Sequence, residues 1–104
     1  MDRPEVEQDI VQITLDRLND KLTHRLHHKG RAAWISTHEI KGIVDEEMDE
    51  LKDACHRNDI LDFEEELLDV AVAAVFGLAS LYKLTGSERI DFAKFFTKTE
   101  EENP

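Results

Sequence analysis

The sequence predicts an all-α fold, a bundle of three long helices and one short helix that is completed by oligomerisation. Apolar residues recur at intervals of three and four along most of the chain, which is the spacing of a helical face. The only two prolines are Pro4 and Pro104, so neither interrupts the middle of the chain. At 104 residues the chain fits one small domain, which we expect to span residues 1–98 ahead of a frayed acidic tail at residues 99–104.

The first predicted helix begins near Pro4, because proline is tolerated in a first helical turn. One face of it carries apolar residues at helical spacing, namely Val11, Leu15, Leu18, Leu22 and Leu26. Histidine and lysine occupy positions 27–29 near the carboxyl end, and Gly30 follows as the expected C′ residue. These features predict a helix that ends immediately before Gly30.

The second predicted helix starts with a capping box, because Ser36 is followed by Glu39 at the required spacing. The helix runs to about Arg57, and Asn58–Asp59 makes the next turn. Its apolar arc comprises Ile40, Ile43, Val44, Met48, Leu51, Ala54 and Cys55. Because Cys55 lies on this arc, we expect it to be a core thiol, and as the only cysteine it has no partner for an internal disulfide.

The third predicted helix begins near Asp62 and ends near Leu84, where Thr85-Gly86-Ser87 stops it. Its run Val70–Ala79 is apolar on every side, and such a helix must be covered on every side. The remaining helices of one chain barely suffice for this, so we expect a homodimer or homotetramer built around the third helix. A short fourth helix is predicted to follow, and its buried side comprises Phe92, Phe95 and Phe96.

Two pairs of carboxylates lie three residues apart on the second and third predicted helices. Glu47 and Glu50 form the first pair. Glu66 and Asp69 form the second, after a spacer of fifteen residues that allows the two helices to fold back antiparallel. Glu47 falls inside the apolar arc, and a bare buried carboxylate costs several kcal/mol. The four carboxylates therefore predict a cation between them, and Mg²⁺ is a hard ion that takes such oxygen ligands.

The other acidic residues and the overall charge exclude some partners. Taken alone, Glu46, Glu64 and Glu65 are best interpreted as a solvated face.

A formal charge of −11 disfavours nucleic-acid polymers and anionic membranes, which both attract basic surfaces. The apolar run of the third helix is expected to be too short to span a bilayer, and no signal-peptide pattern precedes the first helix. We therefore expect a cytoplasmic location and no membrane partner.

The two acidic motifs resemble those of a known family. The first motif is EExxE and begins at Glu46. After a spacer of fifteen residues comes the second motif, ExxD, which begins at Glu66 and is followed by an apolar helix. This order resembles the all-α nucleoside triphosphate pyrophosphohydrolases, the MazG-like group, from about residue 34 to residue 81. The resemblance implies helical dimers or tetramers that bind Mg²⁺, or Mn²⁺ in its place. The metal ligands that it implies are Glu47, Glu50, Glu66 and Asp69.

The resemblance also implies a reaction, in which a nucleoside triphosphate and water give a nucleoside monophosphate and pyrophosphate. Deoxynucleotides or non-canonical nucleotides are the expected substrates. Glu46 and Glu47 are the implied catalytic residues, with Glu46 orienting the attacking water. The segment after the third helix lacks the Asn- and Arg-containing pattern that some members use on phosphates. The candidates for that role are Lys83, Arg89, Lys94 and Lys98, of which Lys83 and Lys94 are the predicted substrate-binding residues.

Trp34 and His38 resemble a Trp and a His that some members place before the first acidic motif. Trp34 is expected either to stack on a base or to anchor two helices. His38 is expected either to hydrogen-bond the nucleotide or to face solvent.

A catalytically silent helical dimer, acting as a binding or regulatory module, is the alternative to an enzyme. A redox di-metal enzyme is disfavoured, because the repeated Glu-x-x-His pattern of di-iron bundles is absent.

Overall fold

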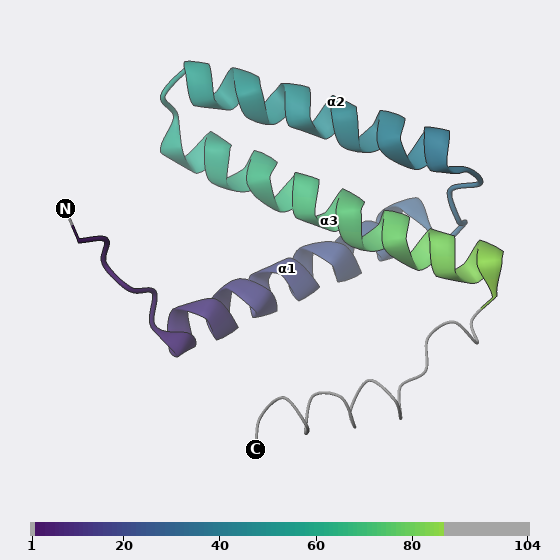
Figure 1. Ribbon diagram of the computed structural model, residues 1–104, viewed down its shortest axis with the longest axis horizontal. Helices are drawn as coiled ribbons and strands as arrows, with labels where there is room; N and C mark the ends of the chain where they lie inside the picture. Colours follow the sequence, from purple (N-terminus) through teal and green to yellow (C-terminus); the bar gives the residue numbers. More distant parts are fainter. Residues whose placement is uncertain (1, 87–104) are drawn as a thin grey trace.

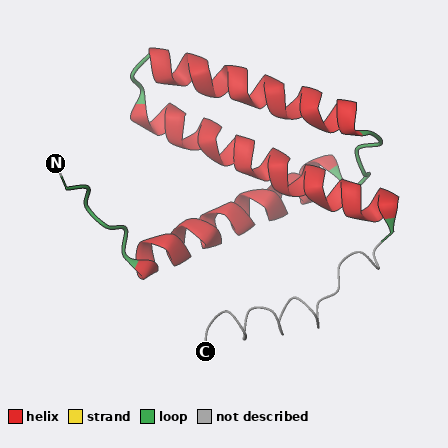
Figure 2. Cartoon of the chain, viewed as in Figure 1, coloured by secondary structure: helices red, strands yellow, loops and turns green. Residues whose placement is uncertain are grey.

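The computed structural model describes residues 2–86, and in this part of the chain every regular element is a helix (Figure 1, Figure 2). The three helices are α1 (Gln8–Lys29), α2 (Thr37–His56) and α3 (Ile60–Thr85). The predicted all-α class and the three long helices are therefore confirmed for these residues. The predicted fourth helix, with its phenylalanines and Lys94, and the acidic tail lie outside the described residues.

α2 and α3 form an antiparallel hairpin and lie side by side along most of their length (Figure 1). The connecting turn uses Asn58 in a left-handed conformation with a φ of 56°, which asparagine tolerates better than most residues. The Asp59 carboxylate then accepts a bond from the backbone N–H of Asp62 at 3.0 Å. Because this cap is satisfied, α3 begins at Ile60, slightly before the expected start near Asp62.

The start of α2 has the predicted cap. Ser36 Oγ accepts a hydrogen bond from the backbone N–H of Glu39 at 3.1 Å. The Glu39 carboxylate reaches back to the backbone N–H of Ile35 at 3.3 Å, one residue earlier than in a standard capping box. The two bonds satisfy backbone donors on both sides of the helix start and set its first residue at Thr37.

The core lies where α2 meets α3. Ala54, Val72, Ala73 and Phe76 are its buried apolar residues. At Gly77 the helices approach so closely that a Cβ would lie 2.7 Å from Cγ2 of Ile40. Any side chain larger than hydrogen at position 77 would therefore displace the Ile40 side chain or the helix that carries it.

The apolar arc of α2 is only partly buried. Cys55 is exposed and Met48 is 47% exposed, so the expectation of a core thiol at Cys55 was wrong. The physical reason is that, within the described chain, α3 is the one helix that packs against α2. A single neighbour covers the middle of an arc and leaves its edges in solvent.

α1 crosses α3 at an angle, and its amino-terminal end lies away from the other two helices (Figure 1). It begins at Gln8 and not near Pro4 as predicted. Val6 is 67% exposed, so a further helical turn at this end would bury no apolar surface to offset its ordering. The carboxyl end is as predicted: Gly30 has a φ of 84° and its N–H donates to the Leu26 carbonyl at 3.0 Å.

Only the carboxyl-terminal part of the apolar stripe of α1 packs against the rest of the chain. Leu18, Leu22 and Leu26 are partly buried, whereas Val11 and Leu15 are 38% and 50% exposed. Ion pairs reinforce the packed part. Arg17 pairs with Glu64 and Glu65, two residues that were expected to form a solvated face and whose side chains remain about half exposed.

α3 lies between the other two helices, but they do not cover its whole circumference. The buried part of the apolar run comprises Val72, Ala73, Phe76 and Gly77. Val75 and Leu78 remain 39% and 49% exposed on the other side. The described chain therefore leaves an apolar strip of α3 open, as the prediction of a covering second chain requires, and that prediction is taken up in the Discussion.

α3 has the length and apolar character of a membrane-spanning helix. It has 26 residues, and its mean hydropathy over an 18-residue window is 1.8. This corrects the expectation of a run too short to span, because the apolar character continues past Ala79 to Leu81 and Leu84. Core helices of soluble proteins share these properties, and α3 buries Val72 and Phe76 in the helix packing.

Candidate metal centre

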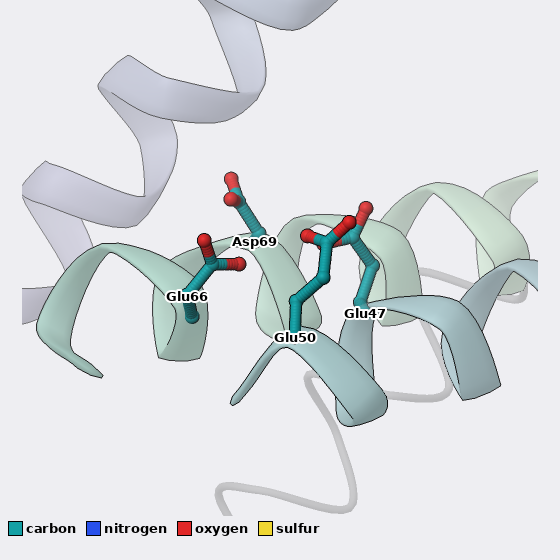
Figure 3. Close-up of side chains that lie close together, drawn as sticks. All are labelled: Glu47, Glu50, Glu66 and Asp69. Carbon is teal, nitrogen blue, oxygen red and sulfur yellow. The ribbon is translucent and has the colours of Figure 1, made fainter. Parts of the chain in front are cut away.

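Four carboxylates converge between α2 and α3. Glu47 and Glu50 lie one helical turn apart on α2, and Glu66 and Asp69 lie one turn apart on α3 (Figure 3). One oxygen of each side chain lies within 4.8 Å of one oxygen of every other. The antiparallel hairpin therefore assembles the cluster that the spacing of the acidic residues predicts.

The environment of the cluster opposes its negative charge. Burial is the first cause that raises the pKa of Glu47 above its ordinary value, and the charges of Glu50 and Asp69 add to it. Burial is also the first cause that raises the pKa of Glu66, followed by its hydrogen bond to Glu50 and the charge of Glu50. Oε2 of Glu47 and Oε2 of Glu66 are buried without a hydrogen-bond partner. Such oxygens need a proton or a cation.

A metal ion of the hard, oxygen-seeking class fits this donor set. All four donors are carboxylates, without nitrogen or sulfur, which favours Mg²⁺ or Mn²⁺ over zinc or copper. Opposite ligands of one Mg²⁺ lie about 4.2 Å apart, since each oxygen is about 2.1 Å from the ion. The observed spread of up to 4.8 Å is slightly wider, so small rotations of the side chains would close the cluster on one ion.

α1 brings a cation to the edge of the cluster. Nζ of Lys21 lies 2.9 Å from Oδ1 of Asp69 and 2.7 Å from Oε2 of Glu65. The sequence interpretation did not include Lys21 in the site. The sequence pattern that could have identified Lys21 is a basic residue at every fourth position of α1, namely Arg17, Lys21, Arg25 and Lys29. That pattern marks one face of a helix but does not say which neighbour the face meets.

A cavity of 270 Å³ adjoins the cluster and is lined by all three helices and the loop between α1 and α2. Glu47 and Asp69 contribute its acidic side, and α1 contributes its basic side. Trp34 also lines it, while the backbone N–H of Trp34 donates to Ser80 Oγ at 3.0 Å. The indole packs edge-on against Phe76, with ring centroids 4.9 Å apart. Trp34 therefore anchors the loop on α3 and also faces the cavity, and base stacking stays a prediction.

Within residues 2–86, the remaining predicted site residues are not brought together with the four carboxylates. Glu46 is exposed on α2 and does not belong to the cluster. His38 is exposed in the first turn of α2 and does not line the cavity beside the cluster. Lys83 lines a different cavity, of 320 Å³, with Arg31, and Lys94 lies outside the described residues.

Replacement of Lys21 by methionine is expected to strengthen Mg²⁺ binding by about fivefold, because it removes a cation that competes for Asp69. Isothermal titration calorimetry with MgCl₂ measures this affinity directly. Lys41→Met is the matched control, since Lys41 forms a similar pair with Asp45 at 2.7 Å outside the cluster. Weaker Mg²⁺ binding by Lys21→Met would instead show that Lys21 holds Asp69 in its binding orientation.

The stability of the metal-free protein is expected to depend on pH through Glu47. Its pKa is raised on folding from an ordinary value of 4.5, so the folded state holds this proton over a wider pH range than the unfolded state. This difference lowers the free energy of unfolding. The loss is absent well below pH 4.5, grows as pH rises from there to the folded pKa of Glu47, and is complete above it. In thermal melts in EDTA, the melting temperature of Glu47→Gln should therefore rise relative to that of the parent as pH rises from acid to neutral. A constant difference across this range would contradict the raised pKa.

Comparisons with protein-family models, with curated proteins and with solved structures give no significant match to this chain. Any assignment of function must therefore rest on the residues themselves. The acidic motifs, the geometry of the cluster and the adjoining cavity are the observations that bear on it.

Proposed function

We propose that this protein is a Mg²⁺-dependent nucleoside triphosphate pyrophosphohydrolase that releases a nucleoside monophosphate and pyrophosphate. The observation that carries the proposal is the partly buried cluster of four carboxylates, in which Glu47 and Glu66 each keep a buried oxygen without a hydrogen-bond partner. A cluster with this charge and burial is stable only with a proton or a cation. The resemblance of the two acidic motifs to those of the MazG-like group supports the choice of reaction.

The proposed ligands are the four clustered residues, with Mn²⁺ able to replace Mg²⁺. When bound, the metal supplies charge neutralisation for the phosphates and activation of a water. Glu47 and Asp69 both belong to the cluster and line the cavity. Because Asp69 is paired with Lys21, Glu47 is the one proposed to hold a proton of that water. Glu46 is proposed to assist in orienting the water, although its exposed position outside the cluster makes that role secondary.

The proposed substrates are deoxynucleotides or non-canonical nucleotides. The proposed assembly is a cytoplasmic homodimer or homotetramer without nucleic-acid or membrane partners. The formal charge of −11 supports the exclusion of nucleic-acid polymers. The apolar strip on α3 that includes Val75 and Leu78 supports self-association.

The proposed reaction is tested with a panel of ribo-, deoxyribo- and modified nucleoside triphosphates in Mg²⁺, repeated in EDTA. Phosphorus NMR of the products should show monophosphate and pyrophosphate, and EDTA should abolish both. A diphosphate with free orthophosphate would identify a different enzyme. No turnover of any nucleotide would favour the second candidate.

The second candidate is a catalytically silent helical dimer that acts as a binding or regulatory module. One observation favours it: Lys21 already supplies Asp69 with a cation from within the chain. In such a module the acidic cluster would be satisfied partly by α1 and would need no turnover. Mg²⁺ would then have little effect on thermal stability, whereas a metalloenzyme gains stability from its bound ion.

A further inference from the structure

The basic face of α1 carries two kinds of side chain. Arg17 and Lys21 are paired with acidic residues of α3. Arg25 and Lys29, the next two at the same spacing, line the cavity beside the cluster and form no ion pair within residues 2–86. Ion pairing between α1 and α3 therefore uses Arg17 and Lys21, and it leaves the charges of Arg25 and Lys29 unpaired beside the cavity.

Arg25 is held in place without using all its hydrogen-bond donors. Its guanidinium carbon lies 4.3 Å from the ring centroid of Phe76 and 5.1 Å from that of Trp34. Nη1 of Arg25 is buried and has no hydrogen-bond partner. A buried N–H of a charged group is costly to leave without an acceptor. The stacked guanidinium is thus preorganised to donate to an anionic ligand in the cavity.

The charged residues that line the cavity are only partly paired with one another. The acidic residues Glu47 and Asp69 come from α2 and α3, and the basic residues Arg25 and Lys29 come from α1. Lys21 pairs with Asp69, whereas Glu47, Arg25 and Lys29 form no ion pair within residues 2–86. Lys29 is near enough for its charge to lower the pKa of Glu47 slightly, but it forms no ion pair with that carboxylate. A ligand that complements both groups presents a cation to the carboxylates and negative oxygens to the basic residues. A phosphate chain carrying Mg²⁺ has this distribution of charge.

We propose that Arg25 and Lys29 of α1 bind the phosphate chain of the metal-bound nucleotide. The inference rests on the proposed function, and it assigns the phosphate contacts to the first helix and not to Lys83, which lines another cavity. Arginine supplies a planar donor pair that fits a phosphate, and Lys29 supplies a mobile point charge. Both lie near the carboxyl end of α1, where the helix dipole repels anions, so cationic side chains are needed there.

The test measures binding of magnesium tripolyphosphate by isothermal titration calorimetry, which requires no turnover. Lys29→Gln and Arg25→Gln are each expected to weaken binding about tenfold, while Arg25→Lys loses less because it keeps the charge. Lys52→Gln and Arg3→Gln are the matched controls, since both residues are exposed and neither lines the cavity. Circular dichroism melts verify that each variant is folded, which matters most for Arg25 because it stacks on Phe76. Titration with MgCl₂ alone should show no loss of affinity in the Lys29→Gln variant, because removal of a positive charge near Glu47 does not weaken the binding of a cation.

The outcomes separate this inference from the proposed function. The inference is wrong if Arg25→Gln and Lys29→Gln both bind tripolyphosphate like the parent. It is also wrong if Lys52→Gln and Arg3→Gln lose as much affinity as Arg25→Gln and Lys29→Gln. Either result would count even if the parent hydrolyses nucleotides. If the parent binds tripolyphosphate through Arg25 and Lys29 but releases no pyrophosphate from any nucleotide, the inference stands and the proposed reaction falls. If the folded parent does not bind magnesium tripolyphosphate at all, the phosphate site is refuted directly.

Discussion

Glu47→Gln is expected to lower turnover of nucleoside triphosphates by on the order of 100-fold or more, and to weaken Mg²⁺ binding in parallel. The substitution keeps the size of the side chain and removes one negative charge from a cluster whose oxygens lie within 4.8 Å of one another. In EDTA the same variant should be as stable as the parent or more stable, because burial and neighbouring charges raise the pKa of this carboxyl. Loss of activity combined with unchanged or higher metal-free stability distinguishes a ligand from a structural residue.

Asp69→Asn is expected to cause a similar loss of turnover but a smaller gain in metal-free stability. Asp69 is paired with Lys21 at 2.9 Å, so the substitution removes an attraction together with the repulsion inside the cluster. Initial rates, titration with MgCl₂ and thermal melts in EDTA measure the three quantities. Asp49→Asn is the matched control, since Asp49 is an exposed carboxylate of α2 that does not belong to the cluster.

The assignment of the metal centre has a clear counter-result. If metal-free Glu47→Gln unfolds at a lower temperature than the parent, Glu47 is an ion-pair partner that stabilises the fold. If turnover of Asp49→Asn falls as far as that of Glu47→Gln, the activity depends on the total charge of α2 and not on the cluster. Either result would remove the main support for the proposed metal site.

Leu78→Glu is expected to convert a dimeric protein into monomers at micromolar concentration. Leu78 is 49% exposed on α3, and Val75 and Leu67 add further apolar surface on the same side of that helix. Burial of a leucine contributes about 1.5–3 kcal/mol, and a symmetric dimer loses this contribution from both copies. The dissociation constant should therefore rise by on the order of 100-fold or more.

Sedimentation equilibrium of the parent and the variant measures this change. Leu61→Glu is a suitable control, because Leu61 is 75% exposed in the first turn of α3, outside the apolar run Val70–Ala79. A parent that sediments as a compact monomer of 12.0 kDa at micromolar concentration would refute the proposed assembly. Dissociation by Leu61→Glu alone would place the interface at the other end of the helix.

The sequence by itself determined the three long helices and the membership of the acidic cluster. Helical spacing places Glu47 with Glu50, and Glu66 with Asp69, and the short turn at Asn58 brings the two pairs together. These are local properties, because they depend on residues three or four positions apart and on one turn. The cap at Ser36 and the helix end at Gly30 are local for the same reason, and both were predicted correctly.

Only the tertiary structure decided what each helical face meets. The spacing of the basic residues on α1 marks a face, but the crossing of α1 over α3 determines that Lys21 reaches Asp69 and that Arg25 lies over Phe76. The same crossing leaves Leu15 50% exposed, although it belongs to the same stripe as the partly buried Leu18 and Leu22. Periodicity specifies which residues share a face, whereas the crossing angle and the number of neighbouring helices decide how much of that face is covered. For this reason Cys55, on an apolar arc with a single neighbour, is exposed.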